Sequence, residues 1–277
     1  MPELPEVELV SRALARLLTG RQIIAAELLR ARLAPDTTPR RFANRLRSKR
    51  VESVGRRGKH LLIRLEHKLV LIAHLRMTGR FLYLPLEAPL PKHTHAVFYL
   101  DNERRLVFTD QRHFGMMKLV HEDELLDTKE LLRLAPEPFS DDFTTDYLRR
   151  VLSRSRRTLK EMMLDQTRIV GLGNIYAAEA LHLARINPFT LSAELSRRRI
   201  PRLHRAILAI LSEAIAHGST MNVDPEDIEG SYYGGGYEGH WRVYDREGER
   251  CPVCRASIRR LMHAGRSTFF CPRCQRR

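Results

Sequence analysis

Four cysteines set the tightest limit on what this chain can fold into. Two CxxC pairs, separated by sixteen residues, contain Cys251, Cys254, Cys271 and Cys274. This spacing is typical of a tetrahedral zinc site made of four thiolates. Gly265 lies between the pairs, where a glycine allows the chain to turn back as a hairpin. We therefore predict a C-terminal zinc ribbon with one structural zinc ion, because four cysteines leave no position open for water.

The position of the cysteines also indicates the compartment. All four lie in the last 27 residues, whereas a secreted disulfide scaffold spreads its cysteines along the chain. No stretch approaches the roughly 20 apolar residues of a membrane span, and the N-terminus lacks a secretory signal pattern. We expect a cytoplasmic protein that does not span a membrane. Four free or redox-active cysteines are the alternative to the zinc site.

The charge balance favours an anionic partner. Lys and Arg number 48 against 33 Asp and Glu, which gives a net charge of +15, and polyanions are the natural partners of such a chain. Residues 246–277 hold nine arginines and two glutamates, a density that suits contacts with phosphates. Nucleic acid is the favoured partner. The alternatives are a ribosomal or membrane-surface protein, and a basic surface that is only solvated.

Apolar spacing divides the chain into a β-rich part and a helical part. Apolar residues from Val7 to Leu18 follow helical spacing, and Gly20 gives a stop signal. Short β-type runs follow, with Asp101-Asn102 as a hairpin turn, and strands at such spacing predict a β-sandwich or barrel. The runs are Gln22–Leu28, Lys59–Leu65, Leu69–Met77, His95–Leu100, Arg105–Thr109 and Gly115–Val120.

Helical periodicity dominates after the proline-rich, acidic segment Ala135–Asp142. From Val223 to Gly239 the sequence has many glycines and no periodicity, which suits a mobile loop. We therefore predict an α+β chain with an N-terminal catalytic domain at 1–134, a helical domain at 135–222 and a loop and zinc region at 223–277. The expected helices are Tyr147–Leu152, Leu159–Leu164, Ile175–Leu183 and Leu203–His217.

The N-terminal sequence MPELPE offers a nucleophile. Removal of Met1 leaves Pro2 with a free secondary amine, and amines attack sugar or carbonyl carbons to form Schiff bases. Glu3 is adjacent and Glu6 lies one turn further along the expected helix, so an acid or base is at hand to move protons. From composition alone, the simpler interpretation is that Pro2 and Pro5 only begin a helix whose dipole the glutamates complement.

Seven motifs resemble those of the formamidopyrimidine-DNA glycosylase family. The resemblance runs from the first residue almost to the last, and the joint occurrence of a PELPE start, a GLGNIYA block and a GRST ribbon is highly specific. The motifs are MPELPEVE at the start, GKHLL at Gly58–Leu62, HLRMTGRF at His74–Phe81, KHTH at Lys92–His95, DQRHFG at Asp110–Gly115, LDQTRIVGLGNIYAAE at Leu164–Glu179 and AGRSTFFCPRCQ at Ala264–Gln275.

This resemblance implies a fold and an activity. Members of the family have an N-terminal helix and β-sandwich, a helix-two-turns-helix domain and a four-cysteine zinc ribbon, with DNA bound in the cleft between the two halves. They flip oxidised purines such as 8-oxoguanine and formamidopyrimidines out of the duplex, excise them and cleave the abasic strand by β,δ-elimination. By this likeness the chain is expected to be a monomeric base excision repair enzyme that acts on damaged double-stranded DNA.

The resemblance also implies catalytic roles for individual residues. By that likeness Pro2 attacks C1′ of the damaged nucleotide, Glu3 shuttles the proton and Glu6 supports the active site. Lys59 matches a lysine near the scissile phosphates that assists β-elimination. Arg266 matches the arginine of the zinc hairpin that grips phosphates beside the lesion and is linked to δ-elimination.

Further positions match the DNA contacts of the family. Met77, Arg112 and Phe114 match the side chains that enter the duplex once the base has left, with Arg112 facing the orphaned opposite base. From the sequence alone, Met77 and Phe114 would be interpreted as structural. Asn174 fits a helix N-cap whose backbone amides can receive a phosphate. The remaining matches to backbone-contact positions are His74, His93, Arg156, Lys160 and Tyr244.

Three departures from the family pattern concern substrate recognition. Thr78 stands where some members have a glutamate near the lesion, and His113 replaces the second arginine of the usual RRFG. The loop after His217 is longer and richer in Gly and Tyr than the usual sequence. Two alternatives stay open: an endonuclease VIII-like glycosylase for oxidised pyrimidines, and a zinc-ribbon DNA-binding protein without catalytic activity.

Overall fold

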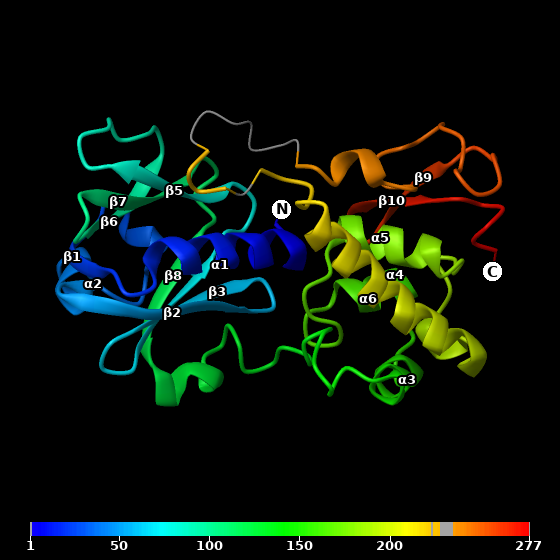
Figure 1. Cartoon of the computed structure of the whole chain (residues 1–277). Coiled ribbons are helices and arrows are strands. Elements are labelled where there is room, and N and C mark those ends of the chain that lie inside the picture. The colour runs from blue at the N-terminus through cyan, green and yellow to red at the C-terminus, as the bar shows by residue number, and fades with distance from the viewer. Residues whose placement is uncertain (1, 223, 228–234, 277) are drawn as a thin grey trace. The chain divides into compact units, whose positions relative to one another are not determined.

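The computed structural model describes residues 2–222, 224–227 and 235–276, which form two compact units (Figure 1). The first unit contains the chain up to Leu132 and the segment 220–235, and the second contains Arg133–Ser219 and the chain from Gly236 onward. Within the described residues, no helix combines the length and the apolar character that crossing a bilayer requires.

Helix α1 (Leu4–Leu18) opens the first unit. Pro5 lies in its first turn, where the missing N–H costs no helical hydrogen bond. Val7, Val10 and Leu14 are buried along one face, which explains the helical apolar spacing. Beyond the end of the helix, Gly20 has a φ of 82°, a backbone conformation that favours glycine. The predicted helix and its stop are confirmed.

Eight strands form one antiparallel sheet in the order β5-β7-β6-β1-β2-β3-β4-β8. The halves β5-β7-β6-β1 and β2-β3-β4-β8 are joined by the pairing of Gln22 with Arg50 and of Ile23 with Lys49. The strands are β1 (Gln22–Leu28), β2 (Lys49–Arg57), β3 (His60–Leu65), β4 (Leu69–His74), β5 (Gly79–Pro85), β6 (Thr94–Leu100), β7 (Arg104–Asp110) and β8 (Met116–His121).

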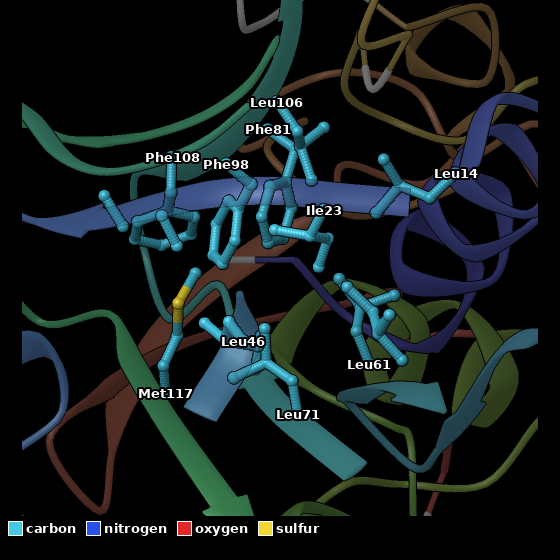
Figure 2. Close-up of a cluster of buried hydrophobic side chains, with 14 of the residues drawn as sticks. Leu14, Ile23, Leu46, Leu61, Leu71, Phe81, Phe98, Leu106, Phe108 and Met117 are labelled. Atoms are coloured by element: carbon cyan, nitrogen blue, oxygen red, sulfur yellow. The ribbon is translucent and has the colours of Figure 1, made fainter. Parts of the chain in front are cut away.

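The core lies between these two halves of the sheet. Figure 2 shows Phe98 and Phe108 of one half above Leu71 and Met117 of the other, with Leu14 of α1 at the side. None of these five side chains is more than 2% exposed, and truncation of such a phenylalanine to alanine typically costs about 3–5 kcal/mol. This shared core confirms the predicted β-sandwich, which the short helix α2 (Pro39–Leu46) also contacts.

The turn after β4 ends that strand earlier than its apolar run suggested. We expected a strand to Met77, but β4 ends at His74. Arg76 has a φ of 56°, and the Gly79 N–H donates to the Leu75 carbonyl oxygen at 2.9 Å. A tight turn therefore replaces the last three expected strand residues, and Met77 lies in the turn.

The second unit is helical up to His217, as expected. Helices α3 (Thr145–Ser153), α4 (Leu159–Leu164), α5 (Asn174–Leu183) and α6 (Ile200–Ala216) coincide with the four expected segments within a few residues. Thr144 and Thr158 cap α3 and α4 by accepting hydrogen bonds from backbone N–H groups. Helix α5 is buried on nearly every side and contacts α4, α6 and β10.

The zinc hairpin is formed by β9 (Arg259–His263) and β10 (Arg266–Phe270). His263 pairs with Arg266 across the turn Ala264-Gly265, whose φ angles are 47° and 72°. Positive φ at both central residues is the turn geometry that suits a twisted two-stranded hairpin. The predicted hairpin with a glycine in its turn is confirmed, and Arg266 is the first residue after that turn.

The glycine-rich segment that we expected to be a mobile loop is described only in part. Residues 223 and 228–234 lie outside the described residues. On the C-terminal side, Tyr237 is fully buried beside Tyr176, and its ring stacks on that of His240 in the 3-10 turn Glu238–His240. This flank is packed, because aromatic side chains anchor it where periodicity gives no signal.

Candidate active site and metal centre

The N-terminus of the first unit is held through Glu6. The Glu3 N–H donates to Glu6 Oε2 at 2.7 Å, and Glu6 Oε1 accepts from the Thr220 backbone N–H at 3.2 Å and from its hydroxyl at 2.9 Å. Glu3 is 2% exposed and Glu6 is fully buried, and Pro2 is also buried. The Glu6 carboxylate thus ties the backbone that carries Pro2 to Thr220.

Lys59 lies in the turn between β2 and β3 and is 5% exposed. Gly58 before it has a φ of 58°, which a glycine adopts without strain. Behind Lys59, the rings of His60 and His74 meet edge to face with centroids 4.6 Å apart. Burial, followed by the charge of Arg76, lowers the pKa of His60 to about 4, and burial lowers that of His74 to about 2. Both imidazoles are therefore neutral at pH 7.

His74, expected to contact the DNA backbone, is largely enclosed. It is 6% exposed, and its Nδ1 accepts a hydrogen bond from the Arg76 N–H at 2.9 Å. This bond defines the neutral tautomer and leaves Nε2 as the protonated nitrogen. His93 differs, because it is exposed and has a φ of 60° in the turn before β6.

The three residues expected to enter the duplex lie on two turns of the first unit. Met77 is partly buried in the turn after β4, and Arg112 and Phe114 follow β7. Phe114 is 47% exposed, and the Arg112 guanidinium carbon lies 5.1 Å from the centre of its ring. The interpretation of Phe114 as a core residue, open from the sequence alone, is wrong, since the ring faces solvent.

The four cysteines of the second unit converge on one point. Their sulfur atoms all lie within 4.8 Å of one another, with Cys254 and Cys271 at 3.4 Å and Cys251 and Cys274 at 3.9 Å. A tetrahedron with zinc–sulfur bonds of about 2.3 Å has edges of roughly 3.8 Å. The donor set therefore fits a single zinc ion with four thiolate ligands and no open position, as predicted.

Lys160 and Asn174 fix the strand that carries Arg266. The Lys160 ammonium donates to the Ser267 carbonyl oxygen and to the Thr268 hydroxyl, both at 2.8 Å, and Asn174 Nδ2 donates to the same Ser267 oxygen at 3.1 Å. Lys160 is only 1% exposed, whereas Arg266 is exposed. The buried side chain of Lys160 thus supports the hairpin backbone directly after the exposed Arg266.

The expected N-cap role of Asn174 is wrong by one residue. Gly173 is the N-cap of α5 and Asn174 is the first helical residue. Its side chain turns to the zinc hairpin, and its Oδ1 is buried with no hydrogen-bond partner among the described residues. Gly173 has an extended backbone, with a φ of −129° and a ψ of −153°, and no side chain caps the helix there.

Tyr244 belongs to the packing of the zinc ribbon. Its ring lies 5.2 Å from Phe269 of β10, and its backbone N–H donates to Glu179 at 2.9 Å. Glu179 is fully buried and accepts from the N–H groups of Arg242 and Val243 as well. Arg156, the last expected DNA contact, is exposed in the turn before α4.

Several residues that hold the N-terminus or the zinc ribbon in place were not predicted from the sequence. Glu179 and Thr220 are two of them, and a third is His182, whose Nε2 lies 3.5 Å from the sulfur of Cys251. An imidazole N–H next to a zinc thiolate stabilises its charge. His182 lies one helical turn after Glu179 on the buried helix α5, and a polar residue at such a position was the sequence signal that could have indicated it. No local signal marks Thr220, which lies 214 residues from Glu6.

A sandwich, a helical domain and a four-cysteine ribbon that presents arginines define a zinc-containing nucleic-acid-binding protein. Three family models match the chain: the formamidopyrimidine-DNA glycosylase N-terminal domain at residues 1–117, the formamidopyrimidine-DNA glycosylase H2TH domain at 134–224 and the zinc finger found in FPG and IleRS at 248–277. Together they span the sandwich, the helices and the ribbon.

Curated relatives are similar over the whole chain. The formamidopyrimidine-DNA glycosylase of Desulforamulus reducens is 41% identical over 277 residues, which cover 100% of this chain and 99% of that protein. The enzyme of the same name from Pelotomaculum thermopropionicum is 43% identical over 276 residues, with the same two shares. The chain therefore belongs to the formamidopyrimidine-DNA glycosylase family.

Solved structures agree with this family. Lactococcus lactis Fpg in complex with DNA containing an abasic site has a TM-score of 0.92 and 34% identity, and the match covers 99% of this chain and 100% of that one. MutM in complex with DNA containing carbocyclic 8-oxo-G has a TM-score of 0.92 and 35% identity, and the match covers 100% of both chains.

Proposed function

We propose that this protein excises oxidised purines, such as 8-oxoguanine and formamidopyrimidines, from duplex DNA and then cleaves the abasic strand. The observation that carries the proposal is the N-terminus: a proline and a glutamate precede α1, and the buried Glu6 fixes their backbone through Glu3 and Thr220. A rigidly held amine suits a nucleophile whose attack needs a defined angle. Relatives solved with FAPY-dG and abasic DNA support this substrate class.

Pro2 is the nucleophile in this proposal, and Glu3 moves the protons. The secondary amine forms a bond to C1′ as the C1′–N9 bond of the purine breaks, and the departing base takes a proton. The amine gives up its proton, the sugar ring opens as O4′ takes up a proton, and a cationic iminium, the Schiff base, then links Pro2 to C1′. Loss of a C2′ proton then expels the 3′ phosphate, a second elimination expels the 5′ phosphate, and water releases the sugar fragment from Pro2.

The positively charged groups act on the phosphates. Lys59, at the turn between β2 and β3, is proposed to assist the first elimination, and Arg266, exposed beside the hairpin turn, to bind a phosphate next to the lesion and assist the second. His93 and Arg156 are exposed and suit contacts with the DNA backbone. Lys160, Asn174, His74 and Tyr244 are mostly enclosed, and their proposed contribution is to orient the surfaces that touch DNA.

The remaining proposals concern organisation. The proposed division of the chain is a catalytic domain at 1–134, a helical DNA-binding domain at 135–222 and a loop and zinc region at 223–277.

The protein is proposed to act as a monomer on damaged double-stranded DNA, since one chain supplies both the nucleophile and the zinc ribbon. The curated relatives are bacterial, which supports work in the bacterial cytoplasm. Sedimentation in the presence and absence of DNA measures the oligomeric state.

Borohydride trapping tests the proposed reaction. Borohydride reduces a Schiff base to a stable amine, so the wild type should form a covalent adduct with a duplex that contains 8-oxoguanine opposite cytosine. Pro2→Gly should bind the duplex but lose the adduct and the strand cleavage, because it changes the nucleophile and leaves the phosphate contacts. Undiminished cleavage by Pro2→Gly would remove Pro2 from the mechanism.

A preference for oxidised pyrimidines is the second candidate. Lactococcus lactis Fpg has been solved with DNA containing an oxidised pyrimidine, and Thr78 departs from members that have a glutamate near the lesion. A parallel trapping experiment with thymine glycol separates the candidates: an adduct on this duplex alone assigns the protein to oxidised pyrimidines. The absence of adducts on both duplexes would favour a DNA-binding protein without catalytic activity.

A further inference from the structure

The buried carboxylate of Asp110 closes the turn that follows β7. Asp110 is fully buried, and its Oδ2 accepts from the Gly115 N–H at 2.6 Å, while its Oδ1 accepts from the Arg112 N–H at 3.2 Å. Both ends of the segment 112–115 are therefore bonded to one side chain. Two hydrogen bonds to one buried side chain therefore hold this turn in place, although the turn projects Phe114 into solvent.

Thr78 joins the other turn to the same carboxylate. Its hydroxyl donates to Asp110 Oδ1 and accepts from the Arg112 N–H at 3.0 Å. A single hydroxyl thus uses its donor and one of its acceptor sites to bridge two segments 32 residues apart. Met77 is the neighbour of Thr78 in the chain, so the bridge connects the backbone of Met77 to that of Arg112.

Both turns pack against the ring of Phe108, which brings them close together. Gly79 pairs with Asp110 in the register of β5 and β7, and the ring of Phe108 lies under both turns. A Cβ atom added at Gly79 would lie 2.8 Å from the Phe108 ring and 2.4 Å from the Leu75 oxygen, and one at Gly115 would also lie 2.8 Å from that ring. Side chains at either position would therefore push the two turns apart.

We propose that Thr78 and Asp110 are positioning residues that hold Met77, Arg112 and Phe114 as one preformed group for insertion into the duplex. This inference rests on the proposed function, because it assigns these three side chains to the space that the extruded base leaves. A fixed group loses less conformational entropy on insertion than two independent turns do. The bridge therefore lowers the free-energy cost of holding the base out, and it fixes the direction of Arg112 towards the opposite base.

The bridge depends on Thr78, which stands where some members of the family have a glutamate. A glutamate at position 78 would be ionised at pH 7 and could not donate to the Asp110 carboxylate, and the two like charges would repel each other. Thr78 supplies the donor instead. The threonine therefore serves the coupling between the two turns rather than recognition of the damaged base.

The test compares Thr78→Val with Thr78→Ser. Valine keeps the shape and removes both hydrogen bonds, whereas serine keeps the hydroxyl. Because both hydrogen bonds of the Thr78 hydroxyl are lost, Thr78→Val should lower kcat/KM about tenfold or more on 8-oxoguanine opposite cytosine. It should also reduce the preference for cytosine over adenine as the opposite base, and Thr78→Ser should restore both values. Thr128→Val is the matched control, because it removes a buried hydroxyl that donates to Leu125 elsewhere in the same unit.

Two further substrates separate positioning from other effects. On a duplex with an abasic site opposite cytosine, Thr78→Val should show the same loss, because the space must still be filled. On a single-stranded abasic oligonucleotide it should match the wild type, because there is no opposite base. A loss confined to 8-oxoguanine would mean that Thr78 contacts the lesion, and an equal loss on all three substrates would mean general destabilisation. Either result overturns the inference, as does an unchanged opposite-base preference. Failure of the proposed function is distinct, since the wild type would then form no borohydride-trapped adduct with the duplex that contains 8-oxoguanine.

Discussion

The Lys160 ammonium lies 2.8 Å from the carbonyl oxygen of Ser267, the residue that follows Arg266. A fully enclosed positive charge from α4 thus determines where the zinc hairpin presents its exposed arginine. Lys160 thus supports the backbone of the hairpin from inside the unit, while Arg266 stays exposed, where the proposed function assigns it a contact with a phosphate.

Replacement of Arg266 tests the outer part of this arrangement. Arg266→Ala should weaken DNA binding and make the slope of log K against log salt shallower by about 1, the signature of one lost phosphate contact. The measurement is a fluorescence titration with a lesion-containing duplex at several salt concentrations. Arg40→Ala is the control, since Arg40 is exposed on α2 of the other unit. An unchanged slope would show that Arg266 is only a surface residue.

Replacement of Lys160 tests the inner part. Lys160→Met removes the hydrogen bonds to Ser267 and Thr268 and fits the same space. Hydrogen bonds to a charged group contribute about 1.5–3 kcal/mol, so thermal stability and DNA affinity should both fall. The salt slope should stay at the wild-type value because the ammonium is 1% exposed. A slope shallower by one phosphate would instead mean that Lys160 itself reaches the DNA.

Glu179 is expected to stabilise the packing of residues 242–244 against helix α5, next to the zinc ribbon. Burial raises the pKa of its carboxyl, yet three backbone N–H groups at 2.8–2.9 Å, from Arg242 to Tyr244, bond to it. Glu179→Ala leaves these donors without a partner at a cost of about 1–3 kcal/mol each if they stay buried. Glu179→Gln retains an acceptor oxygen and should lose less. Equal unfolding midpoints for the two variants would contradict this account.

Much of the fold follows from local patterns. Alternating or continuous apolar runs predicted six of the eight strands, and the CxxC spacing predicted the metal centre. Strand β2 (Lys49–Arg57) was missed because its sequence KRVESVGRR is dominated by charged residues, and its place in the sheet is decided by pairing with β3. The run Leu69–Met77 was read as one strand because nothing local marks the left-handed Arg76.

The site was harder to predict than the fold, since its contacts join distant segments. Family motifs made Pro2, Lys59 and Arg266 candidate site residues by resemblance, but they did not predict which residues hold them in place. The Glu6 carboxylate meets Thr220 across 214 residues, and Asp110 meets Thr78 across 32. Such pairs depend on the tertiary fold, and apolar periodicity carries no information about which buried polar groups will satisfy one another.

Removal of zinc should unfold the ribbon and abolish DNA binding. Four thiolates at 3.4–3.9 Å in the closest pairs repel one another without a cation, and zinc binding supplies much of the folding free energy of such small modules. Trp241, the single tryptophan of the chain, lies 5.1 Å from Tyr244 beside the ribbon, so its fluorescence reports the change. Zinc, but not magnesium, should restore the signal and the affinity. Retained affinity after proven loss of the metal would contradict this prediction.

Acid should destabilise the first unit through His60. Burial first, then Arg76, lowers its pKa from 6.5 to about 4. Between these values the unfolded chain binds a proton that the folded chain excludes, so stability is present above pH 6.5 and is lost as the pH falls towards 4. The loss amounts to about 3 kcal/mol at 1.36 kcal/mol per pKa unit.

Substitution of His60 should reduce this pH dependence without abolishing it, because burial also lowers the pKa of the neighbouring His74, to about 2. Phenylalanine at position 60 keeps an aromatic ring against His74, at the site where the centroids are 4.6 Å apart, and removes the titrating group. Urea unfolding of the wild type and His60→Phe at half-unit steps from pH 7 to pH 4 measures the difference. His67→Asn is the control, because His67 is exposed and has a φ of 62° that asparagine tolerates. Parallel pH profiles for His60→Phe and the wild type would show that folding does not lower the pKa of His60.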